Sequence, residues 1–136
     1  MIRLIVGTKG TGKTKTLIGL VNDALASSKG SVVCIEKGDK LRYDINYRCR
    51  LIDSEAYHVS DGRSLYGFIA GMLASNHDIT DLFIDSALKI CRDDTADFDG
   101  FLEKLGVLDR SVDVNIVITA SIDPSAATEK MKEYIK

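Results

Sequence analysis

The chain has 136 residues, of which 45% are hydrophobic and 28% charged, and its formal net charge at pH 7 is −2. This length suits a single domain over residues 1–136, with the composition of an ordinary globular protein. The charge balance does not indicate nucleic-acid binding, no apolar run is long enough to span a membrane, and no signal peptide is visible. Cys34, Cys49 and Cys91 are odd in number and far apart. They predict free thiols in a cytoplasmic protein.

The first predicted elements are a strand, a glycine-rich loop and a helix. Residues 2–6 form a short apolar, β-branched run, as a buried strand requires. Residues 7–14 read Gly-Thr-Lys-Gly-Thr-Gly-Lys-Thr and fit the pattern G-x-x-x-x-G-K-[ST], which is the Walker A motif. Apolar residues then recur at helical spacing, which predicts a helix from Lys13 to about Ser28 that ends at Gly30.

A loop of this kind is suited to hold a phosphate chain. Small residues let several backbone N–H groups converge on one anion, and the following helix directs its unpaired N–H groups at the same point. The motif places Lys13 to reach the β- and γ-phosphates and the Thr14 hydroxyl to hold Mg²⁺. The predicted nucleotide-binding residues are Gly7, Thr8, Lys9, Gly10, Thr11, Gly12, Lys13, Thr14 and Lys15.

The next stretches predict a second buried strand and then an exposed one. Residues 31–36 contain four consecutive apolar residues and predict a parallel strand near the centre of a sheet. With the preceding strand and helix this strand makes a right-handed βαβ unit. Residues 37–44 are polar and predict a loop, whereas residues 43–52 alternate and predict an edge strand with Arg48 and Arg50 on its polar face. Residues 56–59 suggest a short partner strand.

A third helix and a third buried strand follow. Ser60 or Asp61 is placed to cap a helix over residues 62–75, whose apolar stripe predicts core packing. The run Asp81-Leu82-Phe83-Ile84-Asp85 is an apolar strand that ends in Asp. After a Walker A loop such a run resembles a Walker B motif, in which Asp85 would act on Mg²⁺ opposite Thr14. The alternative for Asp85 is a helix or turn cap.

The last predicted elements are two helices around a strand. Thr95 or Asp97 is placed to cap a helix, and residues 112–120 predict a strand that ends near Thr119 and Ser121. Asp123 and Pro124 open a last helix, which we expect on the surface and frayed because its apolar content is thin. The alternation of strands and helices predicts a three-layer α/β/α sandwich with a mostly parallel sheet. The loop, Asp85 and Thr119 would then meet at the carboxyl ends of the strands.

These motifs resemble those of the P-loop NTPases, in the division that includes RecA-like and AAA+ ATPases. The whole chain is similar to short bacterial P-loop proteins that are sometimes labelled twitching-motility ATPases. The resemblance implies the P-loop NTPase fold, with ATP and Mg²⁺ as cofactors. It also implies that Thr119 or Ser121 lies beside the γ-phosphate, on a strand between the Walker A and Walker B strands, with ordinary turn chemistry at the strand end as the alternative. RecA-type enzymes take a glutamate from a neighbouring strand, and Glu36 is the candidate for that catalytic role, with a solvated strand-end charge as the alternative.

The residue after Asp85 bears on the activity. Related ATPases carry there a glutamate that orients the attacking water, and this chain has Ser86. The resemblance therefore implies a slow or partner-activated Mg²⁺-dependent ATPase. The partner could be another protein or a second copy of this chain that supplies an arginine. ATP is favoured over GTP because no N-K-x-D motif is present.

Two alternatives remain open at this point. One is a binding module that is ordered by nucleotide and hydrolyses little of it. The other is a small-molecule kinase of thymidine-kinase-like architecture, from which the chain departs at Ser86 and in lacking zinc-binding cysteine pairs.

Overall fold

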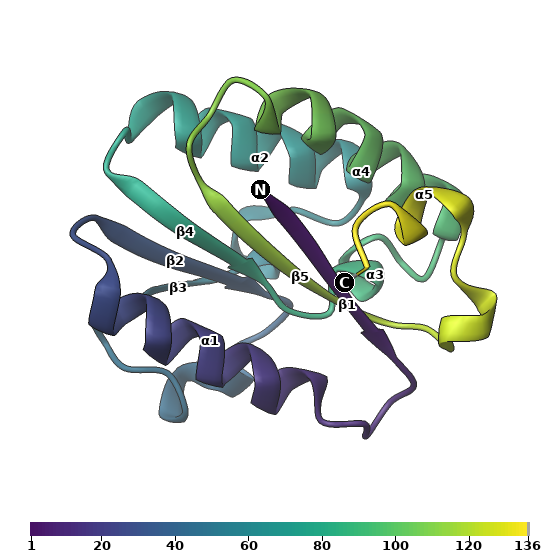
Figure 1. Ribbon diagram of the computed structural model, residues 1–136, viewed down its shortest axis with the longest axis horizontal. Helices are drawn as coiled ribbons and strands as arrows, with labels where there is room; N and C mark the ends of the chain where they lie inside the picture. The colour runs from purple at the N-terminus through teal and green to yellow at the C-terminus, as the bar shows by residue number, and fades with distance from the viewer. Residues whose placement is uncertain (136) are drawn as a thin grey trace.

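A five-stranded parallel sheet forms the middle of the molecule (Figure 1). The computed structural model describes residues 1–135. The strands are β1 (Ile2–Gly7), β2 (Ser31–Glu36), β3 (Arg50–Asp53), β4 (Ile79–Ile84) and β5 (Asn115–Ser121), and they lie in the order β1-β5-β4-β2-β3. Consecutive strands of the chain run parallel because a helix or a long connection separates them.

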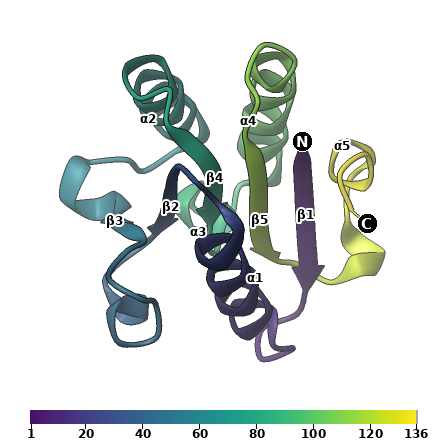
Figure 2. The same cartoon turned by 60° about the vertical axis from the view of Figure 1, so that its left-hand side comes forward.

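Helices cover both faces of the sheet, which gives the expected α/β sandwich. The α-helices are α1 (Lys13–Ser27), α2 (Gly62–Ser75), α3 (Ala87–Ile90), α4 (Thr95–Asp109) and α5 (Glu129–Lys132). Figure 2 shows α1 on one face and α2 and α4 on the other. No helix in residues 1–135 combines the length and the apolar character that a membrane span needs.

Each face of the sheet has its own hydrophobic cluster. The larger one includes Leu4, Leu82 and Ile118 together with buried residues of α2 and α4. The smaller one joins Cys34 and Phe83 to the buried side of α1. Neighbouring residues of a strand point to opposite faces, so β2, β4 and β5 supply both clusters. This two-sided burial explains why these strands read as unbroken apolar runs.

The expected strand over residues 43–52 is wrong for most of its length. Only Arg50–Asp53 pairs with β2, as the edge strand β3, and a 3₁₀-helix, η1 (Lys40–Tyr43), precedes it. The apparent alternation counted two tyrosines as apolar, whereas both lie exposed. The buried residues are instead Leu41, Ile45 and Cys49, at a spacing of four, and they pack in the α1 cluster.

The short strand expected over residues 56–59 is also wrong. Residues 54–57 form a second 3₁₀-helix, η2 (Ser54–Tyr57), and His58 ends it in the left-handed region with φ of 59°. The Asp53 carboxylate accepts the N–H of Glu55 at 2.9 Å and that of Gly38 at 2.8 Å. The Asp53 side chain therefore caps η2 and joins it to the loop after β2. Residues 54–57 are held in this helical turn and pair with no strand.

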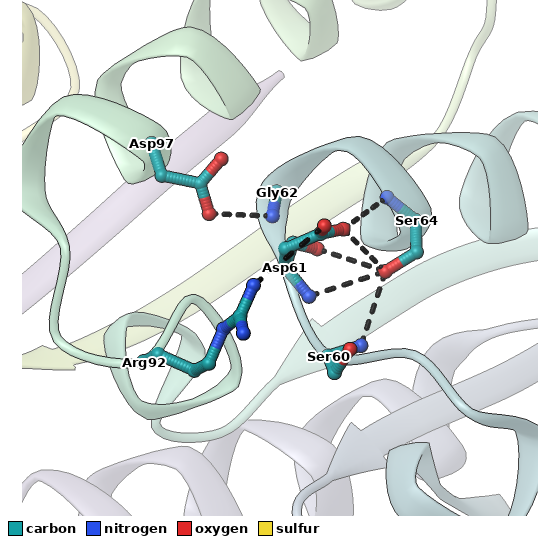
Figure 3. A network of polar contacts seen from close by, with 6 residues as sticks. All are labelled: Ser60, Asp61, Gly62, Ser64, Arg92 and Asp97. Atoms are coloured by element: carbon teal, nitrogen blue, oxygen red, sulfur yellow. Dashed lines mark hydrogen bonds and ion pairs between the residues drawn. The ribbon is translucent and has the colours of Figure 1, made fainter.

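The helix over residues 62–75 is confirmed, with Asp61 as its cap. The Asp61 carboxylate accepts the N–H of Ser64 at 2.7 Å, while the Ser64 hydroxyl accepts the N–H of Asp61 at 3.1 Å (Figure 3). The cap of α4 is Asp94, rather than the expected Thr95 or Asp97. Asp97 instead accepts the N–H of Gly62 at 2.8 Å and so joins the first turns of α2 and α4.

The end of the chain is packed, in contrast to the frayed surface helix that its composition predicts. After η3 (Pro124–Ala126) the chain starts again as the single turn α5, which Thr128 caps. Met131 is fully buried, and the Tyr134 carbonyl accepts the N–H of Leu4 at 2.8 Å. This pairing covers the open edge of β1, where unpaired backbone groups would otherwise face solvent.

Candidate functional site

The carboxyl ends of the strands bring the predicted site residues to one edge of the sheet. Gly7 is in register with Ser121, and Ile84 is in register with both Ile118 and Ile35. Glu36, the last residue of β2, and Asp85, the first residue after β4, therefore lie side by side at the carboxyl end of the sheet. Thr119 of β5 lies next to Asp85 on the other side. The sheet thus gathers residues that are far apart in the sequence.

The glycine-rich loop, residues 7–14, has a backbone that depends on its glycines. Gly10 and Gly12 have φ of 85° and 86°, in the left-handed region that other residues avoid. A Cβ atom at Gly7 would lie only 2.5 Å from the Thr11 hydroxyl oxygen. Gly12 is also the N-cap of α1 and offers no side chain to the first N–H groups of that helix. Those groups remain available to an anion.

Lys13 folds back over this loop. Its ammonium donates to the Thr8 carbonyl at 2.9 Å, and the Thr11 hydroxyl donates to the same oxygen at 2.8 Å. Lys9 and Lys15 are exposed. A cavity of about 390 Å³ lies beside the loop, and its lining includes Gly7, Thr8, Thr11, Lys13, Thr16, Asp123 and Pro124. The lysine is therefore held by a weak, exchangeable contact next to open space.

Asp85 is the centre of the polar contacts. Its carboxylate oxygens lie 3.3 and 3.4 Å from the Thr14 hydroxyl, which comes from the first turn of α1. The Thr119 hydroxyl donates to the same carboxylate at 2.8 Å. The Asp85 N–H donates to the Ile35 carbonyl at 2.8 Å. The sheet therefore holds a nearly buried carboxylate directly opposite the threonine of the loop.

Thr119 lies behind Asp85 and is fully buried. Its hydroxyl oxygen also accepts the N–H of Ser86 at 2.8 Å. Ser86 has φ of 54°, a strained conformation for a residue with a side chain. The Thr119 hydroxyl therefore acts as donor to Asp85 and as acceptor from Ser86, and it positions both the carboxylate and the turn after β4. Ser121, the other candidate, lies half-buried opposite Gly7.

Glu36 is buried, in contrast to the solvated strand-end charge considered as its alternative. One carboxylate oxygen accepts the N–H of Lys40 at 3.1 Å, and the other accepts the N–H of Leu41 at 3.0 Å. Burial raises the pKa of the Glu36 carboxyl above its ordinary value, although these two hydrogen bonds act in the opposite direction. Glu36 thus closes the loop after β2 and caps η1.

A cavity of about 710 Å³ connects Thr14, Glu36 and Asp85 at this edge of the sheet. Sequence reasoning did not assign the other charged or loop residues of the lining to the site: Lys37, Gly38, Asp39, Lys40, Leu41, Glu55, Lys89, Arg92 and Asp93. Arg92 and Asp93 have φ of 57° and 58°, and Arg92 reaches Asp61 at 4.0 Å (Figure 3). Lys89 belongs to α3, a short helix that the sequence pattern did not indicate. The only sequence signal for Lys89, Arg92 and Asp93 is a cluster of charges after Asp85.

The cysteines are free, as the sequence predicts, and all three thiols are buried. Burial raises the pKa of Cys49 to about 11 and that of Cys91 to about 12. These groups therefore stay protonated and carry no nucleophilic chemistry. Residues 1–135 also contain no cluster of three or more His, Cys, Asp or Glu side chains that could hold a metal by themselves.

Comparison with known proteins adds no relative to this description. No protein-family model matches the chain, and no curated protein sequence matches it. A function is therefore inferred from the chemistry of the site itself.

Proposed function

We propose that the protein binds ATP with Mg²⁺ at a site of the P-loop NTPase type and hydrolyses it slowly. The observation that carries this proposal is the contact between Thr14 and Asp85. A hydroxyl at the start of α1 and a carboxylate at the end of β4 lie 3.3 Å apart, although 71 residues separate them in the chain. A cap or packing role for Asp85 does not require this partner.

The loop supports the phosphate part of the proposal. Two glycines in the left-handed region and the uncapped N-terminus of α1 present backbone donors to one anion. Lys13 needs only to exchange the Thr8 carbonyl for a phosphate oxygen. That exchange is favourable because the phosphate oxygen carries negative charge opposite to that of the ammonium, whereas the backbone carbonyl is neutral.

The donor set of Thr14 and Asp85 fits Mg²⁺. Both groups offer oxygen, which this hard cation prefers, and Mg²⁺ is usually held by one or two protein ligands with phosphate and water completing its shell. The absence of a larger ligand cluster in residues 1–135 agrees with this mode. When bound, the ion would neutralise charge on the β- and γ-phosphates. Thr119 would keep the Asp85 carboxylate aimed at Thr14.

The strand order supports the resemblance to the RecA- and AAA+-like division. Strand β5 lies between β1, which leads into the loop, and β4, which leads to Asp85. An inserted strand at this place is the feature that the resemblance implies.

Glu36 is the candidate base for hydrolysis. It lines the same cavity as Thr14 and Asp85, whereas the position after Asp85 carries Ser86. A base whose carboxylate oxygens are already bonded to two backbone N–H groups contributes less than a free, well-aligned one. The geometry therefore supports a slow enzyme.

Calorimetry of ATP binding tests this proposal. Lys13→Ala should weaken ATP about 10- to 150-fold, because a charge-assisted phosphate contact contributes about 1.5–3 kcal/mol. Asp85→Asn should weaken ATP in Mg²⁺ and change its affinity little in EDTA, since Asp85 acts through the metal.

Lys29→Ala is the matched control, because Lys29 is an exposed lysine at the far end of α1. Equal ATP affinity in wild type and Lys13→Ala would contradict the assignment of the loop. An equal effect of Asp85→Asn in both buffers would show that Asp85 is a cap or packing residue.

A further inference from the structure

The connection between β2 and β3, residues 37–50, has a charge opposite to that of the rest of the molecule. It contains five basic residues and two acidic ones, a net charge of +3. Because the whole chain has a net charge of −2, the remaining residues carry −5. All five basic side chains are exposed: Lys37, Lys40, Arg42, Arg48 and Arg50. The average charge of the chain conceals this local basic segment.

Within residues 1–135, only one of these five cations has an acidic partner. Arg42 lies 3.6 Å from Asp39, and its guanidinium also stacks 4.8 Å from the centre of the Tyr43 ring. The other four make no ion pair in this part of the chain. Four exposed, unpaired cations on one short segment provide a site for a polyanion.

Two tyrosines on the same segment lie almost fully in solvent. Tyr43 is 84% exposed and Tyr47 is 92% exposed, more than any other large hydrophobic or aromatic side chain that the structure describes. Arg42 donates to the Tyr43 hydroxyl at 2.8 Å and so restricts that ring. Two exposed aromatic rings four positions apart are suited to stack on a ligand with flat apolar faces.

The segment is held rigidly enough to present these groups. Leu41, Ile45 and Cys49 are buried in the α1 cluster at a spacing of four. Glu36 anchors the N–H groups of Lys40 and Leu41. The segment projects beside α1 and β3 at the edge of the molecule (Figure 2). Its buried residues face the core, which leaves the tyrosines and arginines to face outward.

We propose that residues 37–50 form a binding surface for single-stranded nucleic acid. Cations that follow a phosphate backbone and aromatic rings that stack on bases are the two components of such surfaces. A single strand is required because the bases of a duplex are not open to stacking. A protein partner is less suited, since the aliphatic side chains of the segment, Leu41 and Ile45, are both buried and offer no apolar core for an interface. Lys37 and Lys40 also line the cavity of the nucleotide site, so the two sites adjoin, whereas the tyrosines and arginines of this surface lie outside that lining.

Fluorescence anisotropy with a fluorescein-labelled oligodeoxythymidylate tests the proposal. Tyr43→Ala and Tyr47→Ala should each weaken binding about 5- to 150-fold, because stacking contributes about 1–3 kcal/mol per base. Tyr43→Phe and Tyr47→Phe should bind like wild type, since the ring is kept. Arg48→Ala should lower the slope of log K against log salt by roughly 0.7, the value for one phosphate contact on a single strand.

Matched variants separate this surface from the rest of the molecule. Tyr57→Ala removes another exposed tyrosine, and Arg110→Ala another exposed arginine, and neither should change binding of the oligonucleotide. Measurements in EDTA, with Lys13→Ala beside wild type, show whether the glycine-rich loop binds the backbone. A wild-type protein that binds ATP but not the oligonucleotide would overturn this proposal and leave the proposed nucleotide site standing.

Three results would overturn the proposal. The first is no binding of the oligonucleotide at low salt by a wild-type protein that is folded by circular dichroism. The second is equal affinity for inorganic polyphosphate, which has the charges but no bases. The third is binding that both alanine variants retain, with an unchanged thermal midpoint. Self-association that requires Tyr43 and Tyr47, without oligonucleotide binding, would identify the surface as a contact between protein copies.

Discussion

At the scale of single residues, the contact between Thr119 and Asp85 determines how the carboxylate is presented. Asp85 comes directly after β4 and would be free to rotate without a fixed partner. The Thr119 hydroxyl restrains it at 2.8 Å and at the same time satisfies the Ser86 N–H. One hydroxyl therefore orients the carboxylate and stabilises a strained turn. Thr119 is a positioning residue in this arrangement.

Replacement of this hydroxyl gives a direct prediction. Thr119→Val keeps the shape of the side chain but leaves the buried Ser86 N–H without a partner, which costs about 1–3 kcal/mol of unfolding free energy. It should also weaken ATP binding in Mg²⁺ more than in EDTA, because Asp85 loses its restraint. Urea unfolding and calorimetry measure the two effects. Thr119→Ser should restore both, and an unchanged Mg²⁺ dependence in Thr119→Val would exclude a positioning role.

At the scale of elements, Glu36 joins β2 to η1. Its carboxylate accepts the first N–H groups of that 3₁₀-helix, which no other side chain caps. The same carboxylate lines the cavity with Asp85 and Thr14. The loop that carries Tyr43 and the basic residues is therefore bonded to a residue of the nucleotide site. Lys37 and Lys40 of that loop line the same cavity, so the two proposed surfaces adjoin.

The raised pKa of Glu36 gives a prediction about pH. Burial makes the folded state hold the Glu36 proton more tightly than the unfolded state does. The wild-type protein should therefore lose stability relative to Glu36→Gln as the pH rises from 4.5, the ordinary value, through the raised folded pKa. Denaturant unfolding from about pH 4 to pH 8 measures this difference.

The exposed Glu55, which lines the same cavity, supplies the control. Glu55→Gln should give a pH profile parallel to that of wild type. If the profile of Glu36→Gln is parallel as well, the Glu36 carboxyl titrates normally in the folded protein.

At the scale of the whole molecule, the open question is whether one copy completes the catalytic site. Lys13, Thr14, Asp85 and Glu36 line two cavities at this edge of the sheet, but Arg48 and Arg50 lie on the edge segment. An arginine supplied by a second molecule raises turnover of P-loop enzymes by roughly 10³–10⁵. The edge arginines could reach a neighbour's site only through self-association.

Steady-state phosphate release over a wide range of protein concentration tests this point. We expect the dilute protein to turn over at roughly 10⁻⁴ s⁻¹, near the rate of P-loop GTPases without a supplied arginine and far below the enzyme median of about 10 s⁻¹. If a second copy completes the site, turnover per molecule should rise with concentration in wild type and not in Arg48→Ala. If Glu36 acts as the base within one molecule, Glu36→Gln should slow turnover at every concentration. Fast turnover that neither variant changes would refute both accounts.

Local patterns in the sequence determined most of the elements and the loop. The apolar runs of β2 and β4, the glycines of residues 7–14 and the Asp61 cap each depend on neighbours within a few residues. Such patterns specify an element before any packing occurs. The same holds for Asp85 at the end of an apolar strand. For these reasons the parallel α/β sandwich and the candidate site residues could be predicted.

Only the tertiary structure decided the middle and the end of the chain. Tyr43 and Tyr47 fit a strand pattern, yet the burial of Ile45 and Cys49 against α1 selected a 3₁₀-helix followed by turns, with both rings exposed. Met131 is buried because the last residues cover the edge of β1, where the Tyr134 carbonyl accepts the N–H of Leu4, 130 positions earlier in the chain. Thr119 meets Asp85 through the register of β5 on β4. Each outcome depends on which surfaces meet after folding, and a sequence pattern carries no information about a partner that lies on another element.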